Sequence, residues 1–128
     1  MALAKATLQD LELAPFSEQH PNTLSGGQKQ RLAVAVSMVC GKEVLVFDEP
    51  TSGLDYDNMM RVAKLIDRLS KAGKIIFITT HDYEFVCETC SRILHLDEGE
   101  QNEDWPVSPE NREQLQRLFK ISKGGEAI

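Results

Sequence analysis

Two short apolar runs separated by an amphipathic segment constrain the fold of this chain more than any other feature of its sequence. Residues 44–47 (Val-Leu-Val-Phe) and 75–78 (Ile-Ile-Phe-Ile) contain strand-forming side chains without polar alternation. Such runs are typical of strands that are covered on both faces in a parallel sheet. Residues 57–71 carry apolar side chains at helical spacing. The three segments predict a right-handed βαβ unit, and therefore an α/β fold with a mainly parallel sheet and flanking helices.

A second helix signal covers residues 25–40. Ser25 suits the N-cap position, and Gln28 has the spacing from it that a capping box requires. Residues 32–39 are apolar on nearly every side. We therefore expect this helix to be buried over most of its surface.

The remaining segments give weaker signals. The sequence predicts further helices over 4–13, 82–90 and 110–121, and a short strand over 93–96. The acidic residues between 97 and 104 are typical of a turn followed by a solvated loop. Residues 105–109 indicate a stiff linker, and residues 122–128 a frayed tail.

Composition excludes several classes of protein. The 128 residues suit one compact domain, and a formal net charge of −6 argues against a nucleic-acid binder, which carries a basic face. No apolar stretch approaches the roughly 20 residues of a membrane span, and the first residues lack a signal-peptide core, so we expect a cytoplasmic protein. Cys87 and Cys90 form a single C-x-x-C pair. We interpret them as small side chains packed inward rather than as a zinc site or a redox centre.

The first candidate site is the start of the predicted helix at Ser25. Gly26 and Gly27 let the backbone approach a ligand closely, and a helix N-terminus favours an anion. The Ser25 hydroxyl adds a donor, so the segment is a sensible half-site for a phosphate. The alternative is a capped helix that follows a glycine turn and binds nothing.

Further candidates follow the two predicted strands. Asp48 and Glu49 end the first strand, at the edge where open α/β sheets bind ligands. Asp48 is placed to hold Mg²⁺, and Glu49 to orient or deprotonate a water molecule. His81 follows the second strand and should emerge at the same edge, and Asp55 lies in a turn beside the carboxylate pair. Each of these residues also has an ordinary alternative role, as a loop former, a structural histidine or a helix N-cap.

The order and spacing of these segments resemble the ATP-binding-cassette (ABC) ATPases, over residues 8–100. Residues 24–28 (Leu-Ser-Gly-Gly-Gln) resemble the signature motif of that family, and residues 44–49 its Walker B strand with the catalytic glutamate. Residues 52–55 resemble its D-loop, and His81 its switch histidine. The nearest resemblance within the family is to importer ATPases of the energy-coupling-factor type.

The resemblance implies roles for the candidate residues. In complete family members two cassettes pair head to tail, and ATP lies between the P-loop of one and the signature motif of the other. Asp48 would bind Mg²⁺, Glu49 would activate the attacking water, and His81 would contact the γ-phosphate. The nucleotide-binding residues implied in the same way are Ser25, Gly26, Gly27, Gln28 and Asp55.

The sequence lacks one motif that the family needs. A P-loop has the pattern G-x-x-x-x-G-K-[ST], and no segment of the chain fits it. We therefore expect the C-terminal portion of a cassette, without the P-loop half, that is inactive alone and binds neither ATP nor Mg²⁺ firmly. The resemblance divides it into the end of a helical subdomain (1–40), a Walker B, D-loop and switch-histidine portion (41–100), and a C-terminal linker and helix (101–128).

The leading functional hypothesis is an ATP-hydrolysing, energy-coupling subunit of an ABC importer at the inner face of the cell membrane. Its implied partners are a P-loop half or second cassette and a transmembrane subunit, and exposed apolar surface favours a homo-oligomer. One alternative is a non-catalytic module that lends its signature motif to a P-loop partner. The other is the C-terminal lobe of a chromosome-structure or DNA-repair ABC ATPase, which the acidic charge disfavours.

Overall fold

The computed structural model describes the backbone of residues 2–124 and the side chains as far as residue 120. The chain divides into two compact units, Met1–Thr80 and His81–Ile128, and each is described by itself. Of the expected frayed tail, residues 125–128 lie outside the described residues, whereas residues 122–124 complete the last helix.

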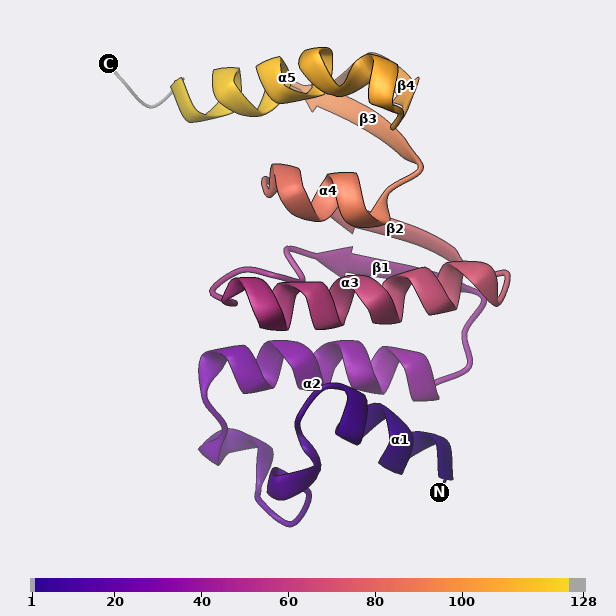
Figure 1. Cartoon of the computed structure of the whole chain (residues 1–128), viewed down its shortest axis with the longest axis vertical. Helices are drawn as coiled ribbons and strands as arrows, with labels where there is room; N and C mark the ends of the chain where they lie inside the picture. The colour runs from indigo at the N-terminus through magenta and orange to yellow at the C-terminus, as the bar shows by residue number, and fades with distance from the viewer. Residues whose placement is uncertain (1, 125–128) are drawn as a thin grey trace. The chain divides into compact units, whose positions relative to one another are not determined.

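The first unit contains the predicted βαβ arrangement. Strand β1 (Val44–Asp48), helix α3 (Tyr56–Lys71) and strand β2 (Ile75–Thr79) follow one another along the chain. The two strands pair in parallel over their whole length, and α3 runs alongside them (Figure 1). The prediction of an α/β fold with parallel strands is confirmed.

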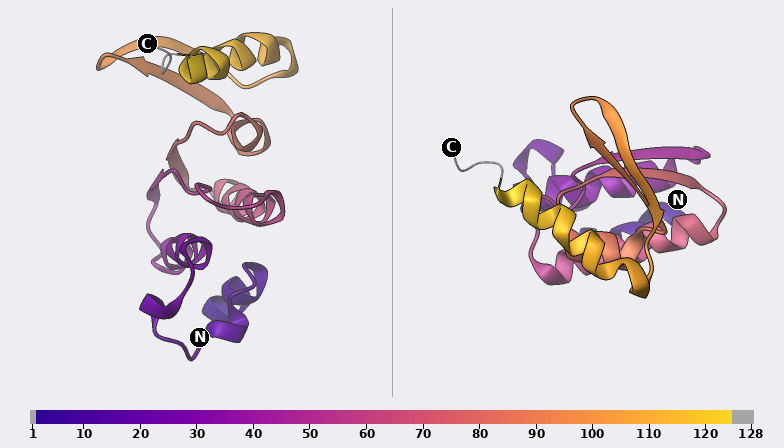
Figure 2. Two further views of the ribbon diagram at one scale, coloured as in Figure 1. Left: turned by 90° about the vertical axis from the view of Figure 1, so that its left-hand side faces the viewer. Right: turned by 90° about the horizontal axis from the view of Figure 1, so that it is seen from above.

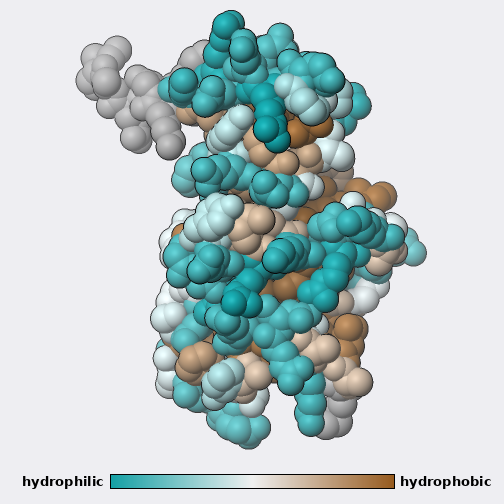
Figure 3. All heavy atoms as spheres, viewed as in Figure 1, coloured by the Kyte–Doolittle hydropathy of each residue, from teal (hydrophilic) through white to brown (hydrophobic). Residues whose placement is uncertain are grey.

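Helix α3 is amphipathic and supplies much of the core of this unit. Its buried side chains share one face and are Met59, Val62, Ala63, Leu65, Ile66 and Leu69. Polar and charged residues, teal in Figure 3, cover most of the face of α3 that is seen there. Gly73 follows the helix with a φ of +84°, in the left-handed region where glycine is favoured at a helix end.

Two helices precede the βαβ arrangement. Helix α1 (Ala2–Asp10) packs against α2 (Gly26–Val39), and short 3₁₀ turns at Ala14–Phe16 and Pro21–Thr23 lie between them in the chain. Helix α2 also runs beside α3, as both Figure 1 and Figure 2 show. The region after α1 is firmly packed, because Leu11 is completely buried.

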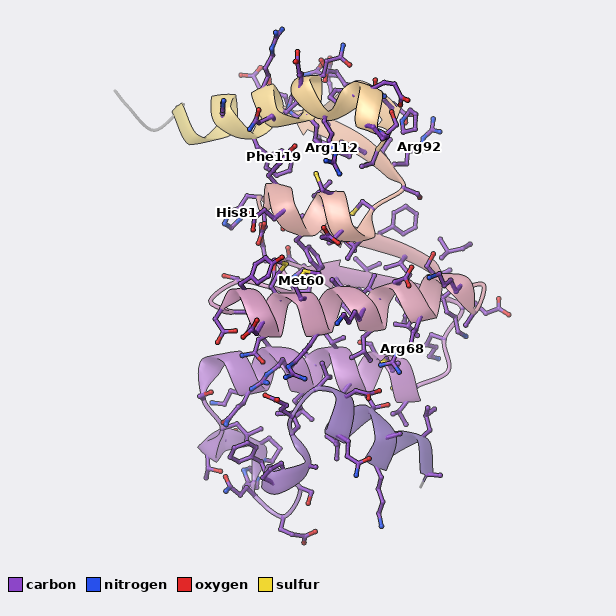
Figure 4. The ribbon with its side chains drawn as sticks, viewed as in Figure 1. Met60, Arg68, His81, Arg92, Arg112 and Phe119 are labelled. Carbon is purple, nitrogen blue, oxygen red and sulfur yellow. The ribbon has the colours of Figure 1, made fainter. Side chains whose placement is uncertain are left out.

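Ion pairs connect the end of α1 with α3. Arg68 Nη2 lies 2.6 Å from Asp10 Oδ2, and Arg61 Nη2 lies 2.6 Å from Glu12 Oε1. Figure 4 labels Arg68 on α3. Because all four side chains remain substantially exposed, each pair adds little to the free energy of unfolding.

Only one face of the β1–β2 sheet is covered, which corrects the expectation that both strands are buried on both faces. Leu45 and Phe47 are each 7% exposed, whereas Val46 and Phe77 are 69% and 53% exposed. Helix α3 packs against one face, and among the described residues of this unit no element covers the other. We call this other face the bare face; its apolar side chains are Val44, Val46, Ile75 and Phe77.

Helix α2 is also less buried than expected. Its buried residues include Val34 and Ala35, while Val36 and Val39 remain 53% and 46% exposed. The prediction of burial on most sides is wrong for the described part of the chain, because α1 and α3 contact only part of the helix circumference. Over the same part of the chain, no helix combines the length and apolar character that crossing a membrane requires.

The second unit places an antiparallel hairpin between two helices. Its elements in chain order are α4 (Tyr83–Thr89), β3 (Arg92–Asp97), β4 (Glu100–Pro106), a 3₁₀ turn (Pro109–Asn111) and α5 (Arg112–Gly124). Strands β3 and β4 pair with an irregularity between His95 and Leu96. Phe85 in α4 and Leu115 in α5 are among the most buried side chains of the described chain.

The hairpin overturns the expected solvated loop over residues 97–104. Glu98 and Gly99 have φ values of +49° and +83°, as in a type I′ turn, whose twist matches that of paired strands. The turn therefore continues directly into a strand. The acidic side chains of β4 remain largely exposed. The prediction that these residues are solvated is therefore confirmed, and the prediction that they form a loop is wrong.

The segment expected as a C-terminal linker and helix (101–128) begins with most of this strand, because β4 runs from Glu100 to Pro106. Arg92 of β3 holds Asp104 of β4 through Nε and Nη2, at 2.6 and 2.9 Å. These hydrogen bonds lower the pKa of the Asp104 carboxyl and raise the pKa of Arg92. The final helix follows as predicted, with bounds shifted to Arg112–Gly124.

Candidate functional site

The start of α2 forms the capping box that the sequence predicts. Ser25 Oγ accepts from the Gln28 backbone N–H at 3.3 Å, and Gln28 Oε1 accepts from the Ser25 N–H at 2.8 Å. Gly26 and Gly27 are the first residues of the helix, and N–H groups at these positions have no partner within an α-helix. A Cβ at Gly26 would meet no described atom within 4 Å. This end of α2 is therefore open to an anion.

The same end of α2 lies against the loop that follows β1. A Cβ at Gly27 would lie 3.2 Å from Leu54 Cδ2, so the glycine permits a close approach of helix and loop. One turn further along α2, Gln30 Nε2 donates to the Glu49 carbonyl oxygen at 2.7 Å. The structure thus brings the candidate phosphate half-site and the candidate water-activating residue together in one unit.

Asp48 and Glu49 are held in different ways at the end of β1. The Thr79 hydroxyl donates to Asp48 Oδ1, which fixes that carboxylate at the edge of the sheet. Glu49 has a φ of +48°, a conformation that costs a non-glycine residue about 1–3 kcal/mol. Its N–H donates to the Thr79 carbonyl at 2.9 Å, and its carbonyl accepts from the Ser52 N–H at 3.1 Å. Strain held in this way is typical of functional sites.

Asp55 caps α3 and is linked to α2 through Asn58. Its Oδ1 and Oδ2 accept from the backbone and side-chain N–H groups of Asn58 at 2.9 and 3.0 Å. The hydrogen bond from the Asn58 backbone lowers the pKa of Asp55. Asn58 Oδ1 in turn accepts from Arg31 Nη1 at 2.5 Å.

Arg31 is a buried cation on α2. It is 8% exposed and also donates to the Leu11 carbonyl at 2.8 Å. Its Nε has no hydrogen-bond partner among the described residues. Because a buried charge is costly unless it is hydrogen-bonded, the contacts to Leu11 and Asn58 fix the position of this part of α2.

Sequence reasoning misses Gln30, Arg31 and Asn58, which connect the candidate residues. One feature of the sequence indicates that Gln30 and Arg31 have such a role. Gln30 and Arg31 are polar residues directly before the apolar stretch 32–39, on a helix predicted to be buried, and buried polar side chains need partners. The hydrogen-bond partners of Gln30 and Arg31 depend on the fold, so the sequence pattern alone could not identify these partners.

His81 begins the second unit, which is a different unit from that of Asp48, Glu49 and Asp55. It lines a cavity of about 490 Å³ whose walls come from α4, α5 and the residues before α4: His81, Asp82, Tyr83, Glu84, Gln116, Phe119 and Lys120. The rings of Tyr83 and Phe119 meet edge to face with centroids 5.8 Å apart. Figure 4 labels His81 and Phe119 in this unit.

A magnesium ion fits the first unit only as part of a nucleotide complex. Among the described residues, no three His, Cys, Asp or Glu side chains gather in a way that could hold a metal ion. Mg²⁺ is commonly bound by one or two carboxylates together with phosphate oxygens and water. Asp48, exposed and oriented by Thr79, suits the role of such a single carboxylate ligand.

Curated proteins with related sequences are named as ATP-binding proteins of transport systems. A putative ABC transporter ATP-binding protein of Treponema denticola is 46% identical over 116 residues, which are 91% of this chain and 23% of that protein. The arginine transport ATP-binding protein ArtP of Escherichia coli is 36% identical over 99 residues, which are 77% of this chain and 41% of ArtP. The chain therefore spans less than half the length of these relatives.

A solved structure and a family model give two further matches. The ATP-binding cassette MJ0796, solved as a dimer in a post-hydrolysis state bound to ADP and Pi, matches with a TM-score of 0.74 and 29% identity, over 84% of this chain and 47% of that chain. Residues 10–87 match a family model described as "AAA domain, putative AbiEii toxin, Type IV TA system". The chain belongs to the family of that AAA domain and, by its relatives and its fold, to the ABC ATPase cassettes.

Proposed function

We propose that this chain supplies the signature helix, the catalytic carboxylates and the switch histidine of an ABC ATPase. A partner that contains a P-loop binds the phosphates of the nucleotide. The observation that carries the proposal is the contact between the glycine-containing start of α2 and the loop after β1. Gly27 packs on Leu54 there, and Gln30 reaches the Glu49 carbonyl. The contact holds the signature helix and the carboxylate-bearing loop in a fixed relationship, and phosphoryl transfer to water depends mostly on such positioning and on charge stabilisation.

Each candidate residue has a role in this proposal. Asp48 binds the Mg²⁺ that accompanies ATP, and Glu49 orients and deprotonates the attacking water. His81 contacts the γ-phosphate, and Asp55 communicates with the partner cassette. The residues that contact the γ-phosphate of an ATP held by the partner are Ser25, Gly26 and Gly27, with Gln28 completing the turn.

The nucleotide itself needs a second polypeptide segment. The chain contains no G-x-x-x-x-G-K-[ST] pattern, and that loop provides the N–H groups and the lysine that hold the β- and γ-phosphates. The proposed division of labour places the signature helix in residues 1–40, the carboxylates and switch histidine in 41–100, and no catalytic residue in 101–128. We propose accordingly that the isolated chain binds ATP poorly and hydrolyses almost none.

The test compares two proteins. One is the isolated chain, and the other is a chimera in which the chain replaces the region of ArtP that aligns with it, here called the ArtP chimera. We expect no measurable ATP hydrolysis from the isolated chain and Mg²⁺-dependent hydrolysis from the chimera. Glu49→Gln should lower kcat of the chimera by about 10²–10⁴-fold, the range for loss of a general base.

Two outcomes contradict the proposal. An isolated chain that hydrolyses ATP, with activity abolished by Glu49→Gln, would reject the need for a partner. A folded ArtP chimera that binds ATP yet hydrolyses none would favour the second candidate, a non-catalytic module that lends its signature helix to a P-loop protein. We retain this second candidate because the sequence contains no P-loop pattern.

The names of the relatives support a proposal about the wider setting. ArtP is named as an arginine transport ATP-binding protein, and we propose that this chain couples ATP hydrolysis to an importer, of the energy-coupling-factor type. Its partners would be a second cassette and a transmembrane subunit, at the cytoplasmic face of the cell membrane. Co-purification of the tagged chain with a membrane subunit tests this setting.

The bare face of the β1–β2 sheet supports association of the isolated chain with itself. Val44, Val46, Ile75 and Phe77 are each more than half exposed, and contiguous apolar surface of this kind marks interaction sites. We propose a homo-oligomer. A monomer in light scattering at high protein concentration would contradict it.

A further inference from the structure

The backbone of Glu49 is held from two sides. Its N–H donates to the Thr79 carbonyl of β2 at 2.9 Å. Its carbonyl accepts from the Ser52 N–H of its own turn at 3.1 Å and from the Gln30 side chain of α2 at 2.7 Å. The Gln30 contact is the shorter of these two hydrogen bonds, and it comes from α2.

The conformation of Glu49 makes that contact important. A glutamate with a φ of +48° lies in a region that side-chain-bearing residues rarely adopt, and surrounding structure has to hold it there. Rotation about φ turns the Cα–Cβ bond, so it also redirects the carboxylate. A group that fixes the Glu49 backbone therefore fixes the direction of the Glu49 Cα–Cβ bond, from which the carboxylate extends.

The next residue of α2 holds the other end of the same loop. Arg31 Nη1 donates to Asn58 Oδ1 at 2.5 Å, and Asn58 donates to both carboxylate oxygens of Asp55. Adjacent residues of one helix thus anchor the loop 49–55 near both of its ends. Since Gly27 is also in contact with Leu54 of this loop, helix and loop form one continuous packed structure.

We infer that Gln30 is a positioning residue, which sets the direction in which the Glu49 side chain leaves the backbone. The inference rests on the proposed function, in which Glu49 activates water, while the hydrogen bond and its effect on Glu49 are measurable on the chain alone. Gln30 acts through the Glu49 backbone, and no contact of Gln30 with substrate is required.

The first test is nuclear magnetic resonance of the full chain. Gln30→Glu keeps the side-chain size and replaces the donor with an acceptor. We expect loss of the strong intraresidue HN–Hα Overhauser effect that a positive φ gives to Glu49. Exchange of the Ser52 amide should rise about tenfold, the change that corresponds to one net hydrogen bond.

Three further variants make this test specific. Gln30→Ala removes the donor without adding charge and should change the Glu49 signals in the same direction, which covers a failure of Gln30→Glu to fold. Gln30→Lys retains a donor and should restore both signals. Lys29→Ala, at the exposed neighbouring position, should leave them unchanged. Unaltered Glu49 and Ser52 signals in folded Gln30→Ala would overturn the inference.

The second test measures catalysis in the ArtP chimera. Gln30→Glu should lower kcat with an unchanged KM for ATP, and Gln30→Lys should recover part of the loss, whereas general destabilisation would not distinguish the two variants. An active chimera with an unchanged kcat in Gln30→Glu would overturn the positioning role alone. A chimera that is inactive without any substitution would reject the proposed function, and the spectroscopic result would still decide the role of Gln30.

Discussion

The Thr79 hydroxyl donates a hydrogen bond to the Asp48 carboxylate, across the last paired residues of β1 and β2. The bond orients one carboxylate oxygen and leaves the other able to bind a cation. Groups that hydrogen-bond to a metal-binding side chain commonly change metal affinity by an order of magnitude or more. The hydrogen bond between these two residues therefore orients the carboxylate of the proposed Mg²⁺ ligand in the absence of the ion.

Removal of that hydroxyl should weaken the use of Mg²⁺. In the ArtP chimera, Thr79→Val should raise the Mg²⁺ concentration for half-maximal ATP hydrolysis by about tenfold. Thr79→Ser keeps a hydroxyl at the same place and should behave like the unsubstituted protein. Equal Mg²⁺ dependence in the Val and Ser variants would show that the bond has no part in metal binding.

The α3 core should dominate the stability of the first unit. Leu65 is 1% exposed, so Leu65→Ala should lower the free energy of unfolding by about 2–5 kcal/mol, as loss of a buried leucine does. Lys64→Ala at the neighbouring exposed position should change it by less than about 0.5 kcal/mol. Urea unfolding followed by circular dichroism compares the two variants, and similar midpoints would contradict the assigned burial.

The cap of α3 should depend on pH. The hydrogen bond from the Asn58 backbone N–H lowers the folded-state pKa of Asp55 below the usual value of an aspartate. A carboxyl with a lowered folded pKa stabilises the fold fully above its unfolded pKa, and the contribution is lost as pH falls through the folded pKa. The stability difference between the unsubstituted chain and Asp55→Ala should therefore be greatest near neutral pH and shrink on acidification. Urea unfolding at pH 7 and near pH 3 measures it, and a constant difference would exclude the charged cap.

Two cysteines should differ in reactivity. Burial raises the pKa of the Cys90 thiol, whereas Cys40 is exposed. Because the thiolate is the reactive form, iodoacetamide at pH 8 should alkylate Cys40 before Cys90, as peptide mass spectrometry would show. Denaturation should remove the difference. Faster modification of Cys90 in the folded chain would contradict this environment.

A charged side chain on the bare face should dissociate the proposed homo-oligomer. Val46 is 69% exposed and sits in the middle of that face, so Val46→Lys should cost little in the monomer and disrupt apolar association. Light scattering should give a lower molecular mass for the variant at equal concentration. Lys42→Ala, at an exposed position before β1, is the control and should leave the mass unchanged.

The features predicted from sequence are those with a local cause. The capping box of Ser25 and Gln28 depends on two residues within one turn, and the βαβ arrangement depends on the runs 44–47 and 75–78 with a helix between them. Both are confirmed. The type I′ turn at Glu98 and Gly99 also depends on adjacent residues. The hairpin was nevertheless not predicted, because the acidic strand after the turn lacks the alternation of apolar residues that is typical of a strand.

Contacts between distant segments could not be predicted. The hydrogen bond from Gln30 to the Glu49 carbonyl joins residues 19 positions apart, and nothing in either segment specifies the other. The bare face was missed for a related reason. A continuous apolar run such as 44–47 indicates that a strand is suited to burial on both sides, while actual burial depends on which other segments pack against it.

The two-stranded sheet of the first unit has a thermodynamic consequence. Among the described residues, β1 and β2 pair only with each other, so each strand presents an outer row of backbone N–H and C=O groups to any further strand. A polypeptide that adds to this sheet binds the folded form and not the unfolded one, and stabilises it by mass action. The thermal midpoint of this chain should therefore rise with its own concentration if copies associate through the sheet, and with the concentration of any partner that completes it.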